Sequence, residues 1–257
     1  MGRPPGGCYQ CMEEAMDRVL PAAFLCALSR FVPLEQAWQW QRQWQRLLIR
    51  NQNQAQIPEL LLLLEHPPCY TLGRGASEQF LGFDPATPPA PLVRLDRGGE
   101  VTHHLPGQLV AYPLLDLKRH RCDLHWYLRE LEGAVIDVLA QFDLFGERRA
   151  GLTGVWLEGK KVAAIGVSAR RWVTQHGVAL NVNCELAGFA AIKPCGLELP
   201  VGGLNQWRPG CSVAQLQQPF AEALAHRLQW RSLQPISEQN LLNFIDQDGL
   251  GLGALEW

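Results

Sequence analysis

One short stretch indicates the fold class: it is Glu59-Leu60-Leu61-Leu62-Leu63-Leu64-Glu65, followed directly by His66-Pro67-Pro68. A short apolar run that is bounded by charged residues and ended by prolines fits a β-strand that is buried on both of its faces. We therefore expect a buried sheet early in the chain.

Helices are predicted on both sides of this strand in the sequence. From residue 34 to residue 50, apolar residues recur at spacings of three, four and seven, and glutamines occupy the remaining positions. This is the pattern of an amphipathic helix with one buried face. Helical spacing recurs at 122–142 and at 213–230, so the sequence predicts a helix in each of these three stretches.

Further strands are predicted in the middle of the chain. Apolar runs at 155–157 and 161–167 flank Glu158-Gly159-Lys160, which is the arrangement of a hairpin around a tight turn. Strands are also expected at 92–95 and 177–183. Hairpins combined with separate helices favour an α+β fold, in which a mixed β-sheet is flanked by helices.

The domain organisation is predicted to be simple. Residues 1–20 lack a regular pattern and contain Pro4-Pro5-Gly6-Gly7, so we expect them to form a mobile leader. Residues 21–235 are expected to form a single domain, and residues 236–257 a C-terminal tail. A chain of 257 residues is long enough to bury a core without disulfides or a structural metal.

Charge and cysteine content narrow the class of protein. Lys and Arg number 23 against 25 Asp and Glu, and no basic block stands out, which argues against a nucleic-acid partner. The eight cysteines are too irregularly spaced for a disulfide framework, so we expect reduced thiols in the cytoplasm. Cys8 and Cys11 have CxxC spacing, but no second pair completes a zinc site, and no metal is expected.

The sequence argues against secretion and membrane insertion. Residues 19–28 are apolar enough to imitate the core of a signal peptide, but Glu13, Glu14 and Asp17 stand where basic residues are expected. No apolar run approaches the roughly 18 residues needed to span a bilayer.

A ligand cradle is the first candidate for a functional segment. The stretch Arg97-Gly98-Gly99-Glu100-Val101-Thr102-His103-His104-Leu105-Pro106-Gly107-Gln108 follows a predicted strand, and paired glycines let backbone amides approach a ligand closely. The same residues are also compatible with a tight turn followed by structural histidines.

Two further segments carry candidate catalytic groups. Cys195 lies between Pro194 and Gly196, a setting in which a thiol is exposed on a constrained turn and can act as a nucleophile. Lys161 stands at the mouth of a nearly all-apolar strand, where it is either a solvated strand end or a general acid and base.

Together these segments resemble the lipoyl(octanoyl) transferase family. The matching pieces run in the order of that family and cover roughly residues 34–230. They are Glu65 to Gly75, Arg97 to Gln108, Lys161 to Gly166, His176 to Asn183, and Pro194-Cys195-Gly196. The resemblance implies an α+β fold shared with lipoate and biotin protein ligases.

The resemblance also implies an activity and a site. The activity is transfer of an octanoyl group from acyl carrier protein to a lysine of a lipoyl domain, through a cysteine thioester and without a cofactor. The acceptors implied are the lipoyl domains of 2-oxoacid dehydrogenase complexes and the glycine cleavage H protein. By position, Cys195 matches the residue that carries the acyl group, and Lys161 the residue that activates it. The positions that match substrate contacts are Arg97, Gly98, Gly99, Glu100, Val101, Thr102, His103, His104, Ala164, Ile165, Gly166, Gly177, Val178 and Ala179.

Three departures and three rival functions accompany this resemblance, and one of the departures is Lys160, which adds a second amine beside Lys161. His103 stands where the family often has Tyr, and Leu105 stands where it often has Gly, so we expect Leu105 to affect the shape of the acyl pocket. The rivals are an ATP-dependent lipoate or biotin ligase, a cysteine hydrolase that uses Cys195 with His104 or His176, and a non-catalytic module that binds acylated carrier protein. A ligase needs no nucleophilic thiol, and a binding module needs neither Cys195 nor Lys161.

Overall fold

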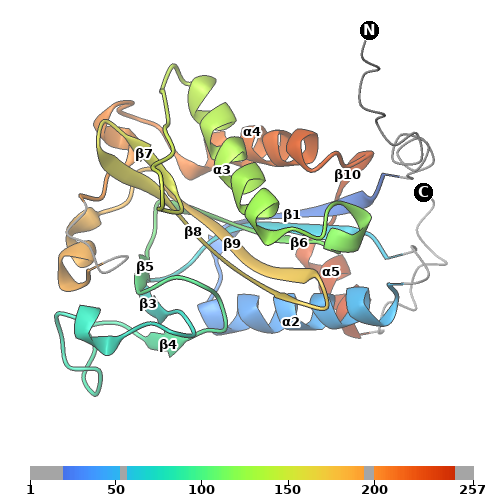
Figure 1. The fold of residues 1–257 in the computed structure, drawn as a ribbon, viewed down its shortest axis with the longest axis horizontal. Helices are drawn as coiled ribbons and strands as arrows, with labels where there is room; N and C mark the ends of the chain where they lie inside the picture. Colours follow the sequence, from blue (N-terminus) through green and yellow to red (C-terminus); the bar gives the residue numbers. More distant parts are fainter. Residues whose placement is uncertain (1–19, 53–56, 194–199, 247–257) are drawn as a thin grey trace, which may run out of the picture.

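The centre of the structure is a mixed seven-stranded sheet (Figure 1). The computed structural model of the chain describes residues 20–52, 57–193 and 200–246. In spatial order the strands are β10 (Ser232–Pro235), β1 (Ala22–Phe31), β2 (Glu59–Glu65), β6 (Gln108–Leu114), β9 (Val173–Asn181), β8 (Lys160–Arg170) and β7 (Val155–Leu157). β1 runs parallel to both β10 and β2, and the remaining neighbours pair antiparallel. The predicted mixed sheet is confirmed.

A smaller sheet and the helices complete the architecture. The small sheet has the order β4 (Leu92–Arg94), β3 (Cys69–Leu72), β5 (Thr102–His104). The helices are α2 (Leu34–Arg50), α3 (Leu124–Ala140), α4 (Val213–Arg227) and α5 (Glu238–Asp246). Short 3₁₀ turns are η1 (Glu78–Phe80), η2 (Leu117–Arg119), η3 (Leu186–Ala191) and η5 (Leu204–Gln206). The three predicted helices are confirmed, and α2 has the predicted limits.

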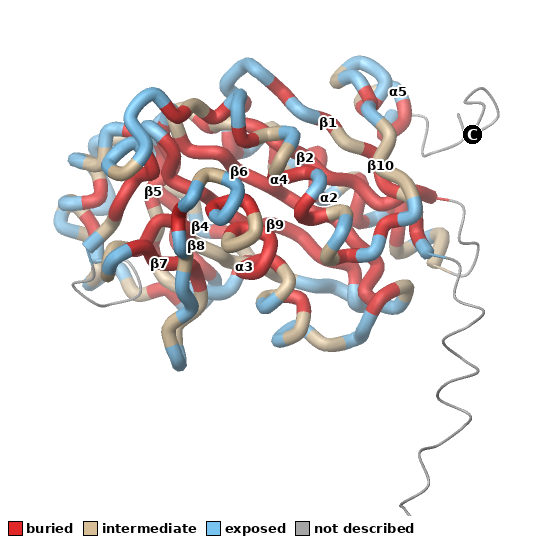
Figure 2. The backbone as a smooth tube through the Cα atoms, turned by 90° about the horizontal axis from the view of Figure 1, so that it is seen from above, coloured by how far each residue is buried: buried red, intermediate tan, exposed pale blue. Residues whose placement is uncertain are grey.

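The leucines of β2 pack on both faces of the sheet, as predicted. Leu61 and Leu63 belong to a core that is shared with α3 and α4. Leu60, Leu62 and Leu64 belong to a second core that is shared with α2 and α5. Figure 1 shows these helix pairs on opposite sides of the sheet, and Figure 2 shows that the central strands are buried. Because side chains alternate along a strand, a continuous run of leucines supplies both layers at once.

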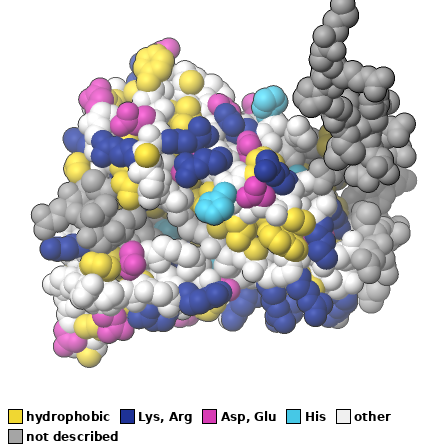
Figure 3. Space-filling view, in the orientation of Figure 1, with side chains coloured by type: hydrophobic (Ala, Val, Ile, Leu, Met, Phe, Trp, Pro, Cys, Tyr) yellow, Lys and Arg dark blue, Asp and Glu magenta, His cyan; other side chains and the backbone are white. Residues whose placement is uncertain are grey.

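α2 is amphipathic, as its sequence predicts. Trp44 is fully buried, and its indole Nε1 donates a hydrogen bond to the Pro58 carbonyl oxygen at 3.2 Å. On the opposite face, the exposed residues Arg42, Arg46 and Arg50 follow each other at intervals of four. Basic side chains are visible along the lower edge of Figure 3, where α2 lies. The helix is therefore oriented by burial of its aromatic face.

Regular structure was not predicted for β1 and α5, nor for the strands β3, β5, β6 and β10. β1 falls in the apolar stretch that was considered only as a secretion signal, and it is an inner strand of the main sheet. α5 lies within the predicted C-terminal tail, yet Phe244 stacks on Trp44 with ring centroids 4.9 Å apart, and Leu241 and Ile245 are buried. The packed core thus continues past residue 235, through Ile245.

Some predictions fall on other parts of the chain. The leader up to residue 19, the Cys8 and Cys11 pair and residues 247–257 lie outside the described residues. Among the residues that the structure describes, no helix is long and apolar enough to cross a membrane.

Candidate active site

A cavity of about 270 Å³ opens between the main sheet and two loops. β8 and β9 form one side of it, and the loop around Arg97, β5, β6, η3 and the loop that precedes β7 contribute to the others. Its lining residues include Leu95, Arg97, Gly99, Glu100, Val101, Thr102, His104, Gln108, Tyr112, Gly151, Leu152, Thr153, Lys161, Ala164, Ile165, Gly166, His176, Gly177, Val178, Ala179, Asn181, Phe189 and Val201. The surface exposed in the cavity is mostly apolar, although about half of the side chains that line it carry a polar or charged group.

The loop that begins with Arg97 is fixed against β8 by close backbone contacts. Gly98 N donates to the Val167 carbonyl oxygen at 2.9 Å. Arg97 is 7% exposed, and its guanidinium donates to Thr71 Oγ1 at 2.7 Å and to the Thr71 carbonyl oxygen at 2.9 Å. A Cβ at Gly166 would lie 3.0 Å from the Gly98 carbonyl oxygen, so a side chain would crowd the loop where it meets the strand. The Arg-Gly-Gly sequence therefore forms a cavity wall.

Lys161 is 7% exposed at the start of β8. Its backbone N donates to the Pro200 carbonyl oxygen at 2.8 Å, and its carbonyl oxygen accepts from Gly202 N at 3.0 Å. Its Nζ lies 5.3 Å from the centroid of the Trp156 ring, a cation–π contact. The amine is thus held at the cavity wall rather than in solvent, and the prediction that it is a solvated strand end does not describe it.

The orientation of the His104 ring is fixed by a chain of amides. Asn181 Nδ2 donates to the Gly202 carbonyl oxygen at 3.0 Å, so Asn181 Oδ1 accepts from Gln108 Nε2 at 2.9 Å. Gln108 Oε1 then accepts from His104 Nδ1 at 2.7 Å. Burial lowers the pKa of His104 well below its ordinary value, so the ring is neutral and carries its lone pair on Nε2.

Two further histidines are buried beside the cavity. His66 Nδ1 donates to the Val32 carbonyl oxygen at 2.6 Å, and its Nε2 accepts from the Tyr112 hydroxyl at 2.8 Å. Burial lowers the pKa of His66 to about 4. His176 Nε2 donates to Asp96 Oδ1 at 2.8 Å, and burial lowers the pKa of His176 although the carboxylate opposes that shift. All three rings are therefore neutral at pH 7.

The structure brings together most of the positions that match substrate contacts in the family. Arg97, Gly99 to Thr102, His104, Ala164 to Gly166 and Gly177 to Ala179 all line the cavity with Lys161. Gly98 lies behind this wall, where its amide bonds to β8. Cys195 lies outside the described residues, and the chain is described again from Pro200, which is hydrogen-bonded to Lys161.

His103 and Leu105 do not line the cavity, in contrast to the expectation for both. His103 stacks on Tyr70 with ring centroids 4.2 Å apart, and its Nδ1 donates to the Cys69 carbonyl oxygen. Leu105 is 4% exposed and packs in a separate cluster with Tyr70 and Leu72. Alternation along β5 explains this difference for His103, because neighbouring strand residues face opposite sides.

Sequence reasoning missed several cavity residues. The loop residues Gly151, Leu152 and Thr153 precede the predicted hairpin, and Tyr112 lies in β6, for which no strand was predicted. The signal available in the sequence was the pair of glycines, Gly151 and Gly154. In the structure both have positive φ angles, of 76° and 139°. Within the described part of the chain, no group of three or more His, Cys, Asp or Glu side chains could hold a metal ion.

Comparison with solved structures identifies the class of fold. The structure is similar to a lipoate-protein ligase A that was solved with ATP bound, with a TM-score of 0.65 and 15% identity over 93% of this chain and 98% of that one. It is also similar to a bi-partite lipoate protein ligase from Thermoplasma acidophilum, with a TM-score of 0.62 and 15% identity over 93% of this chain and 99% of the other. The fold is that of the lipoate protein ligases.

Sequence comparison identifies the family within this fold. The family model for the lipoyl protein ligase A/B catalytic domain matches residues 38–225. An octanoyltransferase of Synechococcus sp. (strain WH7803) is 62% identical over 80% of this chain and 85% of its own length. One from Prochlorococcus marinus (strain MIT 9313) is 57% identical over 84% of this chain and 89% of its own length. The chain belongs to the lipoyl protein ligase A/B catalytic domain family, and these relatives place it among the octanoyltransferases, which are acyltransferases.

Proposed function

We propose that this octanoyltransferase moves an octanoyl group from octanoyl acyl carrier protein to a specific lysine of a lipoyl domain, with Cys195 as the intermediate carrier of the acyl group. The acceptors in this proposal are the lipoyl domains of 2-oxoacid dehydrogenase complexes and the glycine cleavage H protein. The observation that carries the proposal is the juxtaposition of a buried lysine amine with a largely apolar cavity.

In the first half-reaction, Lys161 accepts the proton of the Cys195 thiol, and the thiolate attacks the thioester carbonyl of the donor. A new C–S bond to Cys195 forms as the C–S bond to the carrier breaks. The leaving thiolate takes the proton back from Lys161. No redox change occurs, and no group other than the two thiols and the lysine is required.

In the second half-reaction, the neutral amine of the acceptor lysine attacks the Cys195 thioester. An amide C–N bond forms as the C–S bond breaks, and the amine proton passes through Lys161 to the departing Cys195 sulfur. Arrangement of the amine, the thioester and Lys161 in one cavity supplies proximity that a reaction in water lacks.

The geometry supports two parts of this proposal. Pro200 follows the Pro194-Cys195-Gly196 sequence by a few residues and is hydrogen-bonded to Lys161, so the chain returns to the lysine immediately after the thiol in sequence. The apolar side chains of Val101, Ile165 and Val178 offer a surface on which a saturated chain can be buried. The proposal also places the protein in the cytoplasm. The five cysteines that the structure describes are free thiols, which is consistent with that location.

Intact-mass analysis tests the proposal directly. After mixing with octanoyl acyl carrier protein, the wild-type enzyme should gain the mass of one octanoyl group, and a lipoyl domain added next should take that mass over. Cys195→Ala should show neither event. An octanoyl adduct on Cys195→Ala, or full transfer by that variant, would exclude the thioester. Formation of an acyl adenylate from ATP and octanoate would instead support a ligase.

A further inference from the structure

Glu132 is a fully buried carboxylate on α3. Its Oε2 accepts from Arg129 Nη1 at 2.5 Å and from Arg148 Nε at 3.0 Å. Its Oε1 accepts from the backbone N of Gly154 at 3.0 Å. The two arginines neutralise the buried charge, and the third contact reaches the loop that lines the cavity.

Gly154 is the point at which this loop touches Lys161. Its φ angle of 139° is one that residues with a side chain rarely adopt. A Cβ at this position would lie 2.6 Å from Lys161 Cε and 3.3 Å from Lys161 Nζ. The lysine side chain therefore rests against the bare Gly154 Cα, and any displacement of Gly154 changes the space in which the amine lies.

We propose that Glu132 is a positioning residue of the active site: its carboxylate holds Gly154, and Gly154 in turn seats the Lys161 amine. The inference rests on the proposed role of Lys161 toward Cys195. Arg148 strengthens the arrangement, because it belongs to the same loop and its Nη2 also donates to the Arg129 carbonyl oxygen at 2.9 Å. The loop is thereby fixed to α3 through both Arg148 and Gly154.

A charge effect and a positioning effect predict opposite shifts for the thiol. Loss of the Glu132 charge leaves Arg129 and Arg148 uncompensated, and added positive charge nearby favours a thiolate. Displacement of Lys161 removes the group that accepts the thiol proton and then stabilises the thiolate, and so it disfavours the thiolate. The pH midpoint for alkylation of Cys195 by iodoacetamide therefore falls if only the charge matters and rises if positioning matters.

The test compares Glu132→Gln with Glu130→Gln. Glu130 is on the same helix and accepts from Arg227 Nη1 at 3.3 Å, a contact that does not involve the cavity, so it is a matched control for loss of one paired carboxylate. In Glu132→Gln we expect the saturating rate of Cys195 octanoylation to fall about tenfold to a hundredfold. We expect a smaller change in the concentration of donor at half-saturation, and an alkylation midpoint displaced to higher pH. Glu130→Gln should retain the wild-type rate and midpoint.

Gly154→Ala supplies an independent variant, because its Cβ would lie 2.6 Å from Lys161 Cε. The same Cβ would lie 2.6 Å from the Ala163 carbonyl oxygen, so rates are compared per folded molecule. If Glu132 acts through Gly154, the rate losses of the two single variants should not multiply in the double variant. A wild-type rate in Glu132→Gln, a midpoint displaced to lower pH, or fully multiplicative losses would each overturn the inference. These outcomes are distinct from failure of the proposed function, in which the wild-type enzyme itself forms no adduct at Cys195.

Discussion

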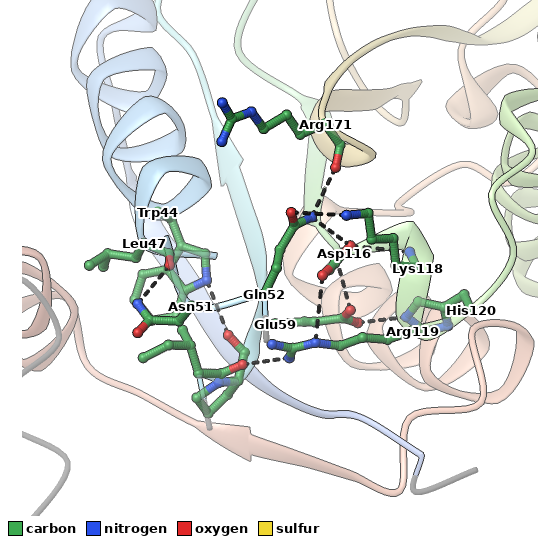
Figure 4. A network of polar contacts seen from close by, with 12 residues as sticks. Trp44, Leu47, Asn51, Gln52, Glu59, Asp116, Lys118, Arg119, His120 and Arg171 are labelled. Atoms are coloured by element: carbon green, nitrogen blue, oxygen red, sulfur yellow. Dashed lines mark hydrogen bonds and ion pairs between the residues drawn. The ribbon is translucent and has the colours of Figure 1, made fainter. Parts of the chain in front are cut away.

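Glu59 and Glu132 are both fully buried, but they hold different parts of the molecule together. Glu59 lies at the start of β2, where it accepts from His120 Nε2 at 2.8 Å, from Trp230 Nε1 at 2.6 Å and from Asp116 N at 3.0 Å. Figure 4 shows this network, which continues through Asp116 to Gln52 and the β8–β9 turn. Glu132 instead reaches a loop that lines the cavity.

The comparison shows that burial alone does not distinguish a structural carboxylate from one that serves the site. Both groups satisfy their oxygens with strong donors, as buried charges must. The two glutamates differ in what their hydrogen-bond partners contact. The partners of Glu59 join elements of the fold, whereas Gly154, the partner of Glu132, touches Lys161. Loss of Glu59 should therefore appear in stability, and loss of Glu132 chiefly in rate.

We expect the largest loss of rate in Lys161→Arg, because Lys161 is the residue that Glu132 positions through Gly154. Arginine keeps the positive charge but cannot release a proton at accessible pH, so acid and base catalysis should be lost by about 10²-fold to 10⁴-fold. Single-turnover octanoylation of Cys195 measures this loss. Lys160→Arg is the matched control, because Lys160 bonds to Gln206 and does not line the cavity, and it should keep the wild-type rate. Near-normal acylation by Lys161→Arg would show that the amine acts only through its charge.

Glu59→Gln should lower the stability of the protein rather than its rate. The amide presents N–H groups where His120, Trp230 and Asp116 already donate, so at least one buried donor loses its acceptor. Removal of one partner from a buried charged network costs about 3 kcal/mol. Urea unfolding should show this loss, while the rate per folded molecule stays unchanged. A reduced rate with unaltered stability would reverse the roles assigned to the two glutamates.

The elements predicted well from the sequence are those whose own residues determine them. α2 has an aromatic face and a basic face, and β2 is a run of leucines, so periodicity alone defines both. β1 and α5 were missed for a physical reason. The burial of Phe24 in β1 and of Phe244 in α5 depends on their contact with each other and with Trp44, which is distant in sequence from both.

The candidate site shows the same division. The glycine-rich loop and the β8 and β9 segments were predicted from motifs, and the structure groups them around one cavity. Tyr112 and Glu132 carry no motif, because tertiary packing alone brings them to the site or to its supporting loop. Leu105 was misplaced because its position in a motif does not determine which way its side chain packs.

Unlike Glu59 and Glu132, His66 is a buried titratable group that is neutral, and its effect on stability should depend on pH. Its pKa is lowered by burial to about 4, whereas an unfolded chain has the ordinary value of about 6.5. Between these pH values the unfolded state binds more protons than the folded state. The contribution of His66 to the free energy of unfolding is therefore fully present above pH 6.5 and falls as the pH drops toward 4. The loss from this one group reaches about 3 kcal/mol at pH 4.

Unfolding by urea at a series of pH values measures this dependence. His66→Gln should be less stable at pH 7, because two buried hydrogen bonds change, but its stability should decline less steeply between pH 6.5 and pH 4. Some decline should remain, since the pKa of His104 is lowered by the same cause. An unchanged slope in His66→Gln would show that His66 is not the group that takes up the proton.

The smallest expected effect is a change in chain-length preference, which should occur in a variant of the cavity and not in a variant of the cluster that contains Leu105. Ile165 lines the cavity, whereas Leu105 does not, and each can lose one carbon by substitution with valine. One CH₂ of buried surface is worth about 0.8 kcal/mol, or a factor of roughly four in an equilibrium constant. Ile165→Val makes room for the donor chain, so the rate with decanoyl carrier protein relative to octanoyl should rise by up to about that factor. Leu105→Val should instead lose about 1 kcal/mol of stability and keep the wild-type chain-length profile. Single-turnover acylation of Cys195 with six-carbon to twelve-carbon donors measures both profiles. A shifted profile in Leu105→Val, together with an unchanged one in Ile165→Val, would place the acyl chain on the Leu105 side of the wall.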